Sequence, residues 1–120
     1  MDIIDHTVFE PDETVFKTDQ NVFVHDRVDG VDILRVYGEV DLSSVAALET
    51  ALQGAATPNA QILVDLQPCT FIDSSVLAAL IRAEKTYQGR FGLILPEAGP
   101  VRRIFTITSL LEHFKIAAAI

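Results

Sequence analysis

The second half of the chain alternates between short apolar runs and a helical pattern. Residues 62–66 and 91–95 are apolar runs with β-branched members, and each is bounded by residues typical of turns. Four apolar residues between the two runs have the spacing of one helix face: Val76, Leu80, Ala83 and Tyr87. A strand, a helix and a second strand in this order make a parallel pair joined by a crossover. The pattern therefore predicts an α/β fold.

The first half of the chain adds an antiparallel pair of strands. Residues 22–24 and 33–37 are apolar segments of the kind found in strands. Between them, Asp29-Gly30 is a two-residue turn signal, because glycine accepts positive φ at little cost. A helical pattern then covers residues 45–52. We therefore expect a β-hairpin followed by a first helix.

The C-terminal part of the sequence completes the predicted order. Pro100 suits the first position of a third helix. We expect residues 110–114 to form a further short turn of helix and residues 115–117 to form a last short strand. The whole order is hairpin, helix, strand, helix, strand, helix, strand. We expect one α/β domain over residues 21–120, with a mixed, mostly parallel β-sheet, an N-terminal β-hairpin and α-helices packed against the sheet.

Residues 1–20 form an N-terminal extension without a sustained period. The segment carries six acids and one lysine among scattered apolar residues. Two interpretations stay open for it. It is either a tail or an extra strand laid over the domain.

Charge and composition exclude several classes of partner. The formal net charge is −8 with nine Lys and Arg residues, so we expect no nucleic-acid partner. An acidic surface favours either solubility or a partner with a basic face. No apolar run approaches the roughly 20 residues of a membrane-spanning helix, so we expect no membrane insertion. The acidic start also lacks the basic residues of a signal peptide. The single cysteine, Cys69, cannot form an internal disulfide, which fits the cytoplasm.

The sequence also lacks the usual catalytic and metal-binding constellations. His6, His25 and His113 lie far apart without a cysteine partner, so we expect no metal site. There is no glycine-rich phosphate loop, no dinucleotide-binding turn and no nucleophile elbow. We therefore expect no cofactor, no catalytic residues and no enzyme activity.

The most informative polar residues stand where a strand gives way to a helix. Asp73, Ser74 and Ser75 directly precede the helical stripe that begins at Val76. Asp73 is a good N-cap, because its carboxylate accepts helix N–H groups and is favoured by the helix dipole. Capping alone is enough to explain these residues. The same position can also offer a hydroxyl, and a phosphate added to Ser74 would bring about −1.5 to −2 units of charge to one spot.

Several motifs in the chain resemble a known family. Residues 62–75, ILVDLQPCTFIDSS, look like the signature of the STAS domain, an apolar strand ending in D-L, then phenylalanine and D-S-S. Residues 38–41 (GEVD), 100–105 (PVRRIF) and 108–110 (TSL) are similar to further motifs of that family. The resemblance runs from about residue 22 to residue 116. It implies a STAS-like fold for nearly the whole domain.

The family includes bacterial anti-sigma-factor antagonists, so the resemblance implies a phospho-switch. In such proteins the first serine after the aspartate, here Ser74, is phosphorylated by a serine-kinase-type anti-sigma factor. The unphosphorylated antagonist binds this kinase, phosphorylation ends the binding, and a phosphatase restores it. The same match implies partner-binding roles for Asp41, Ser43, Asp73, Ser75 and Val76. The resemblance thus implies a regulator of transcription rather than an enzyme.

Two positions depart from the family pattern. Val76 stands where the family has the glycine after D-S-S, and Ser109 replaces a second glycine. The β-branched Val76 either keeps a partner's backbone away or turns inward with the helix stripe. These departures and the N-terminal extension favour an alternative. It is a non-switching STAS interaction module, such as a stress-complex scaffold or an accessory subunit of a lipid transporter.

Overall fold

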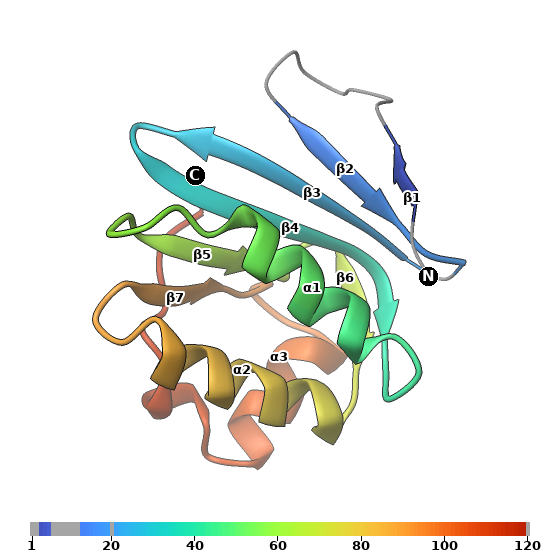
Figure 1. The fold of residues 1–120 in the computed structure, drawn as a ribbon. Helices are drawn as coiled ribbons and strands as arrows, with labels where there is room; N and C mark the ends of the chain where they lie inside the picture. The colour runs from blue at the N-terminus through green and yellow to red at the C-terminus, as the bar shows by residue number, and fades with distance from the viewer. Residues whose placement is uncertain (1–2, 6–12, 20, 120) are drawn as a thin grey trace.

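A seven-stranded sheet carries the fold (Figure 1). The computed structural model describes residues 3–5, 13–19 and 21–119, and every element below lies within those ranges. The strands are β1 (Ile3–Asp5), β2 (Thr14–Lys17), β3 (Asn21–Val28), β4 (Val31–Val40), β5 (Ile62–Asp65), β6 (Cys69–Ile72) and β7 (Phe91–Ile94). The helices are α1 (Val45–Ala55), α2 (Ser74–Thr86) and α3 (Pro100–Ile107), followed by a 3₁₀ turn, η1 (Leu111–His113). The strand order is β1-β2-β3-β4-β5-β7, and β6 also pairs with β4.

The sheet is mixed because its two halves are connected differently. Strands β1, β2, β3 and β4 pair antiparallel in chain order. Helical crossovers make the pairs β4–β5 and β5–β7 parallel, and β6 is also parallel to β4. Strands β3 and β4 are the predicted hairpin, and Asp29 and Gly30 in its turn have the positive φ values, 51° and 80°, that a type I′ turn requires. The predicted α/β class with a mixed sheet is confirmed, and β1 and β2 extend its antiparallel part.

Two of the strands come from the predicted N-terminal extension, residues 1–20. Strands β1 and β2 fall inside it and continue the sheet beyond β3. Val15 on β2 is 1% exposed, and Phe16 packs against the main hydrophobic core. Residues 1–2, 6–12 and 20 lie outside the described part of the chain. The described part of the extension is therefore built into the sheet, while the domain boundary at residue 20 stays a prediction.

Strand β6 is absent from the predicted order of elements. Its last residue, Ile72, pairs in parallel with Val40 at the end of β4. The strand has four residues with an exposed centre, so it lacks the length and alternation by which sequence patterns reveal a strand. The predicted last strand at 115–117 is reduced to one bridge, between Leu93 and Ile116.

The helices bury the main core against the sheet. Helices α1 and α2 lie side by side across one face, and α3 packs against β6 (Figure 1). The α2 stripe is buried as predicted, with Val76 0% and Leu80 1% exposed, and Phe105 of α3 closes the same core. A smaller cluster on the opposite face consists of Ile33, Leu63 and Ile94. No helix in the described ranges combines the length and apolar character needed to cross a membrane.

Candidate functional site

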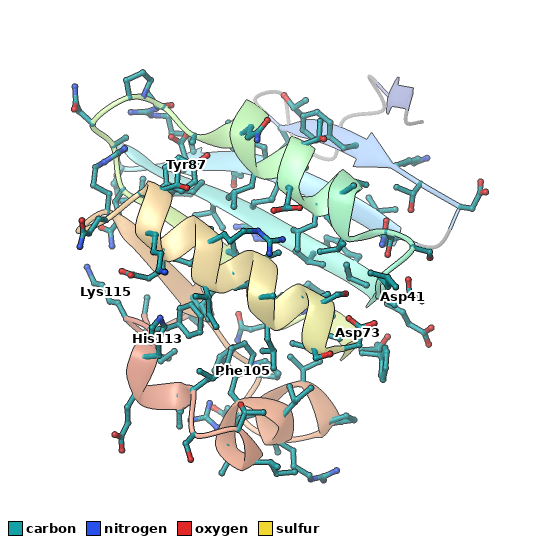
Figure 2. All side chains as sticks on the ribbon, turned by 60° about the horizontal axis from the view of Figure 1, so that its bottom comes forward. Asp41, Asp73, Tyr87, Phe105, His113 and Lys115 are labelled. Atoms are coloured by element: carbon teal, nitrogen blue, oxygen red, sulfur yellow. The ribbon has the colours of Figure 1, made fainter. Side chains whose placement is uncertain are left out.

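Two acidic loops begin side by side because the strands before them are paired. Val40 and Ile72 are the last residues of β4 and β6 and stand opposite each other in parallel register. Asp41 and Asp73 directly follow these two strands, so both leave the sheet at the C-terminal ends of β4 and β6. Figure 2 shows both aspartates together at the end of the molecule where α2 begins.

Asp73 caps helix α2, as predicted. Its backbone is extended, with φ −115° and ψ −175°. Its Oδ1 accepts the backbone N–H groups of Ser75 at 3.0 Å and Val76 at 3.3 Å, and the Ser75 hydroxyl donates to the same oxygen. The first N–H groups of a helix have no backbone partner, so this carboxylate satisfies donors that would otherwise be unpaired. Asp73 therefore sets the residue at which α2 starts.

The second oxygen of Asp73 reaches the neighbouring loop. Oδ2 accepts a hydrogen bond from the backbone N–H of Leu42 at 3.0 Å. Within that loop, Oδ1 of Asp41 accepts the backbone N–H of Ser43 at 3.0 Å and the Ser43 hydroxyl at 2.6 Å. The backbone N–H of Asp41 donates to Oγ of Ser44 at 3.1 Å. The two aspartates thus hold both loops in one connected hydrogen-bond network.

Both carboxylates of this network are ionised at neutral pH. The hydrogen bond from the Ser75 hydroxyl lowers the pKa of Asp73, and it outweighs the opposing effect of burial. The Ser43 hydroxyl likewise lowers the pKa of Asp41, although the nearby charge of Asp73 opposes that shift. Hydrogen bonds to the charged form of a carboxyl group favour that form. The site therefore carries two negative charges at one edge of the sheet.

Ser74 is the first residue of α2, and its side chain is exposed. The neighbouring hydroxyls of Ser75 and Ser43 each donate to an aspartate. By contrast, no hydrogen bond joins the Ser74 hydroxyl to another residue in the part of the chain that the structure describes. Ser74 therefore presents an uncommitted hydroxyl to solvent at the start of a helix.

The structure brings together four of the five residues predicted to bind a partner. Ser75 is bonded directly to Asp73, and Ser43 is bonded to Asp41 in the adjacent loop. Val76 lies elsewhere, because its side chain is 0% exposed and belongs to the main core. It turns inward with the helix stripe, which is one of the two outcomes expected for this position. Its side chain therefore lies beneath the surface and cannot contact a partner directly.

Two exposed apolar side chains beside the site were not among the predicted residues. Leu42 is 75% exposed between Asp41 and Ser43, and Phe71 is 44% exposed two residues before Asp73. Leu42 comes two residues after Val40, the last residue of β4, so in the sequence it looks like a continuation of the apolar pattern of that strand. The sequence feature that could have identified Leu42 as exposed is its position between two polar loop residues, outside the apolar stripe of the helix that follows.

The described residues include two shallow hollows but no cluster of metal ligands. No group of three or more His, Cys, Asp or Glu among them could hold a metal ion. One shallow hollow lies between α1 and α2, beside the Glu49–Arg82 ion pair. The other lies near Arg90. Arg90 already donates to the backbone oxygens of Thr57 and Ala60. The C-terminal ends of α1 and α2, with their free carbonyl groups, lie at the hollow near Arg90. Their partial negative charge disfavours an anionic ligand there.

Comparison with known proteins adds a family and a set of related folds. A family model described as "Mlab, STAS domain" matches residues 24–112. No curated protein matches the chain. An anti-sigma factor antagonist from Mycobacterium paratuberculosis has a similar structure, with a TM-score of 0.74 and 24% identity over 83% of this chain and 87% of that chain.

Two further similar structures are both of a protein named SpoIIAA, one unphosphorylated and one phosphorylated. The anti-sigma factor antagonist SpoIIAA in its unphosphorylated form gives a TM-score of 0.58 and 24% identity, over 82% of this chain and 88% of that chain. The Bacillus cell fate determinant SpoIIAA in its phosphorylated form gives 0.55 and 23%, over 82% of this chain and 91% of that chain. At these identities the structural matches show a shared fold.

Proposed function

The chain belongs to the STAS domain family, and from this premise we propose that it is an anti-sigma-factor antagonist that works as a phospho-switch. Unphosphorylated, it binds a serine-kinase-type anti-sigma factor through the surface around Asp41, Ser43 and Asp73. Phosphorylation of Ser74 by that kinase ends the binding, and a phosphatase restores it. The protein acts in the cytoplasm as a binding partner and kinase substrate, and it catalyses no reaction itself.

The observation that carries this proposal is the uncommitted hydroxyl of Ser74. It is exposed on the first turn of α2, while the hydroxyls of Ser43 and Ser75 are held by aspartates. A phosphoryl acceptor has to reach a kinase active site, and an exposed hydroxyl without a competing hydrogen bond meets that need. Of these three serines, Ser74 therefore fits the acceptor role best.

The charge around Ser74 supports a switch rather than a passive modification. Asp73 already occupies the N–H donors of Ser75, Val76 and Leu42, so an added phosphate finds these donors taken. Phosphorylation adds about −1.5 to −2 units of charge beside two ionised carboxylates. In the kinase active site the new phosphate faces the phosphates of the bound nucleotide, and these like charges repel each other at short range. The modified protein is therefore expected to leave the kinase.

The test uses the purified chain with each serine-kinase-type anti-sigma factor of the source organism and ATP. Intact-mass spectrometry should show the addition of one phosphate to the wild type and none to Ser74→Ala. Ser75→Ala is the matched control, because it removes the neighbouring hydroxyl and should still be labelled. Equal labelling of the wild type and Ser74→Ala would show that the acceptor is another residue.

A second candidate function is a non-switching STAS interaction module, a scaffold or an accessory subunit that stays bound to its partner. Strands β1 and β2 favour it, because they widen the sheet beyond the hairpin and add surface for a permanent contact. The variant Ser74→Asp separates the two functions. A switch loses its complex with the partner in Ser74→Asp, whereas a permanent module keeps it.

A further inference from the structure

Leu42 combines strong exposure with a fixed backbone. It is the most exposed of the large apolar side chains in the described residues, at 75%. A single exposed leucine needs no explanation by itself, because folded proteins expose many of them. Here, however, its N–H is bonded to Asp73, and the turn around it is held by hydrogen bonds between Asp41, Ser43 and Ser44. The side chain is therefore presented from a loop whose backbone is already ordered.

The register of the sheet places Leu42 next to the proposed phosphorylation site. Val40 and Ile72 are paired, so Asp41 and Asp73 take corresponding positions after the two strands. Leu42 and Ser74 are the residues that follow these two aspartates. The 3.0 Å bond from the Leu42 N–H to the Asp73 carboxylate joins these two turns directly. A protein that brings its active site onto Ser74 therefore has to lie close to Leu42.

We propose that Leu42 is the apolar anchor of the partner interface, and that it fills an apolar pocket rimmed by cationic side chains on the anti-sigma factor. This inference rests on the proposed function of the same surface. The apolar pocket follows from the exposed leucine side chain. The cationic rim follows from charge complementarity, because the ionised Asp41 and Asp73 and the exposed Glu39 lie around the two turns.

The ordered loop explains why one leucine can matter. Binding usually has a cost for ordering loops and side chains, and a loop that is ordered beforehand reduces it. Burying a leucine side chain fully in a partner gives a tenfold to hundredfold gain in affinity, as an order of magnitude. The carboxylates contribute mainly through long-range attraction, which salt screens, whereas apolar burial is not screened.

The test measures the dissociation constant by calorimetry, with the kinase that labels Ser74. Leu42→Ser should weaken binding by about tenfold to a hundredfold, and by the same factor at low and high salt. Leu42→Met keeps an apolar side chain and should bind like the wild type. Ile107→Ser is the matched control, because Ile107 is 73% exposed on α3, and it should change binding less than about twofold. Asp41→Asn should weaken binding mainly at low salt.

The outcomes separate the anchor from the switch. If the kinase binds and labels Leu42→Ser as it does the wild type, Leu42 is not the anchor and the switch stands. An equal loss in Ile107→Ser also overturns the anchor, since the effect then follows general surface apolarity. A wild type that no kinase binds or labels overturns both. Circular dichroism of Leu42→Ser should match the wild type, because the substituted side chain is mostly in solvent.

Discussion

Oδ2 of Asp73 accepts the backbone N–H of Leu42 at 3.0 Å, which joins the start of α2 to a loop 31 residues earlier in the chain. The other oxygen of the same carboxylate caps the helix that carries Ser74. One side chain therefore holds both halves of the site. The first prediction concerns its removal.

Replacing Asp73 with alanine removes the cap and the bond between the loops. We expect the free energy of unfolding to fall by about 1 kcal/mol, the usual cost of losing an N-cap. Urea denaturation at pH 7, followed by circular dichroism, measures this loss. Asp73→Asn keeps an oxygen acceptor and should lose less. Equal stability of Asp73→Ala and the wild type would contradict the role of the cap.

The charge of Asp73 adds a pH dependence to that prediction. Its pKa in the fold is lowered from 3.8, first by the Ser75 hydroxyl, so the ionised form is stabilised by folding. This contribution is complete above the unfolded pKa and is lost as the pH falls through the folded pKa. The stability difference between the wild type and Asp73→Asn should therefore shrink as the pH falls below 3.8. A difference that does not change with pH in that range would show that the charge is irrelevant.

The substitution Ser109→Gly should make the protein more stable. Its φ is 60°, in the left-handed region, where it ends α3. The N–H groups of Ser109 and Leu110 bond back to Thr106 and Phe105, the pattern of a Schellman motif that favours glycine. We expect Ser109→Gly to raise the free energy of unfolding by about 0.5–1 kcal/mol, because glycine avoids the steric cost of this backbone.

Asn59 is the control for that substitution. Its φ is 65°, but asparagine tolerates the left-handed region better than serine does. Asn59→Gly should therefore gain less stability than Ser109→Gly in the same denaturation experiment. If Ser109→Gly is destabilising, the strain assigned to residue 109 is wrong.

Gly92 should not tolerate a side chain. A Cβ atom there would lie 2.9 Å from Cδ2 of Leu63 and 3.1 Å from the backbone oxygen of Lys115, which accepts the N–H of Leu93. We expect Gly92→Ala to cost about 1–3 kcal/mol, the usual range for overpacking a core. Hydrogen exchange should also be faster at the N–H groups of Leu93 and Ala117, because the C-terminal segment is displaced from β7.

Gly54→Ala, in helix α1, is the matched control for Gly92→Ala. A Cβ atom at Gly54 would lie 3.7 Å from the Phe16 ring, an ordinary contact. Gly54→Ala should therefore raise stability by about 0.5–1 kcal/mol, because alanine is the better helix former. Opposite signs for the two glycines are the expected result. Two losses of similar size would mean that the crowding at Gly92 is not specific.

Local patterns in the sequence were enough to predict most of the secondary structure. The spacing around Val76 and Leu80 marked the buried face of α2, and Asp29-Gly30 marked the turn of the hairpin. The cap at Asp73 was also predictable, because an N-cap depends on its immediate neighbours. Strand β6 was missed, because the strand with which it pairs in the described part of the chain is the distant end of β4.

The residue order within one short segment already establishes that Ser74 follows a capping aspartate at a helix start. Segments distant in the chain supply the rest of the site. The pairing of Val40 with Ile72 brings the Asp41 loop to Asp73, exposes Leu42 beside Ser74 and leaves Val76 in the core. Hydrogen bonds and packing between such segments form only when the sheet assembles, so no window of the sequence contains them.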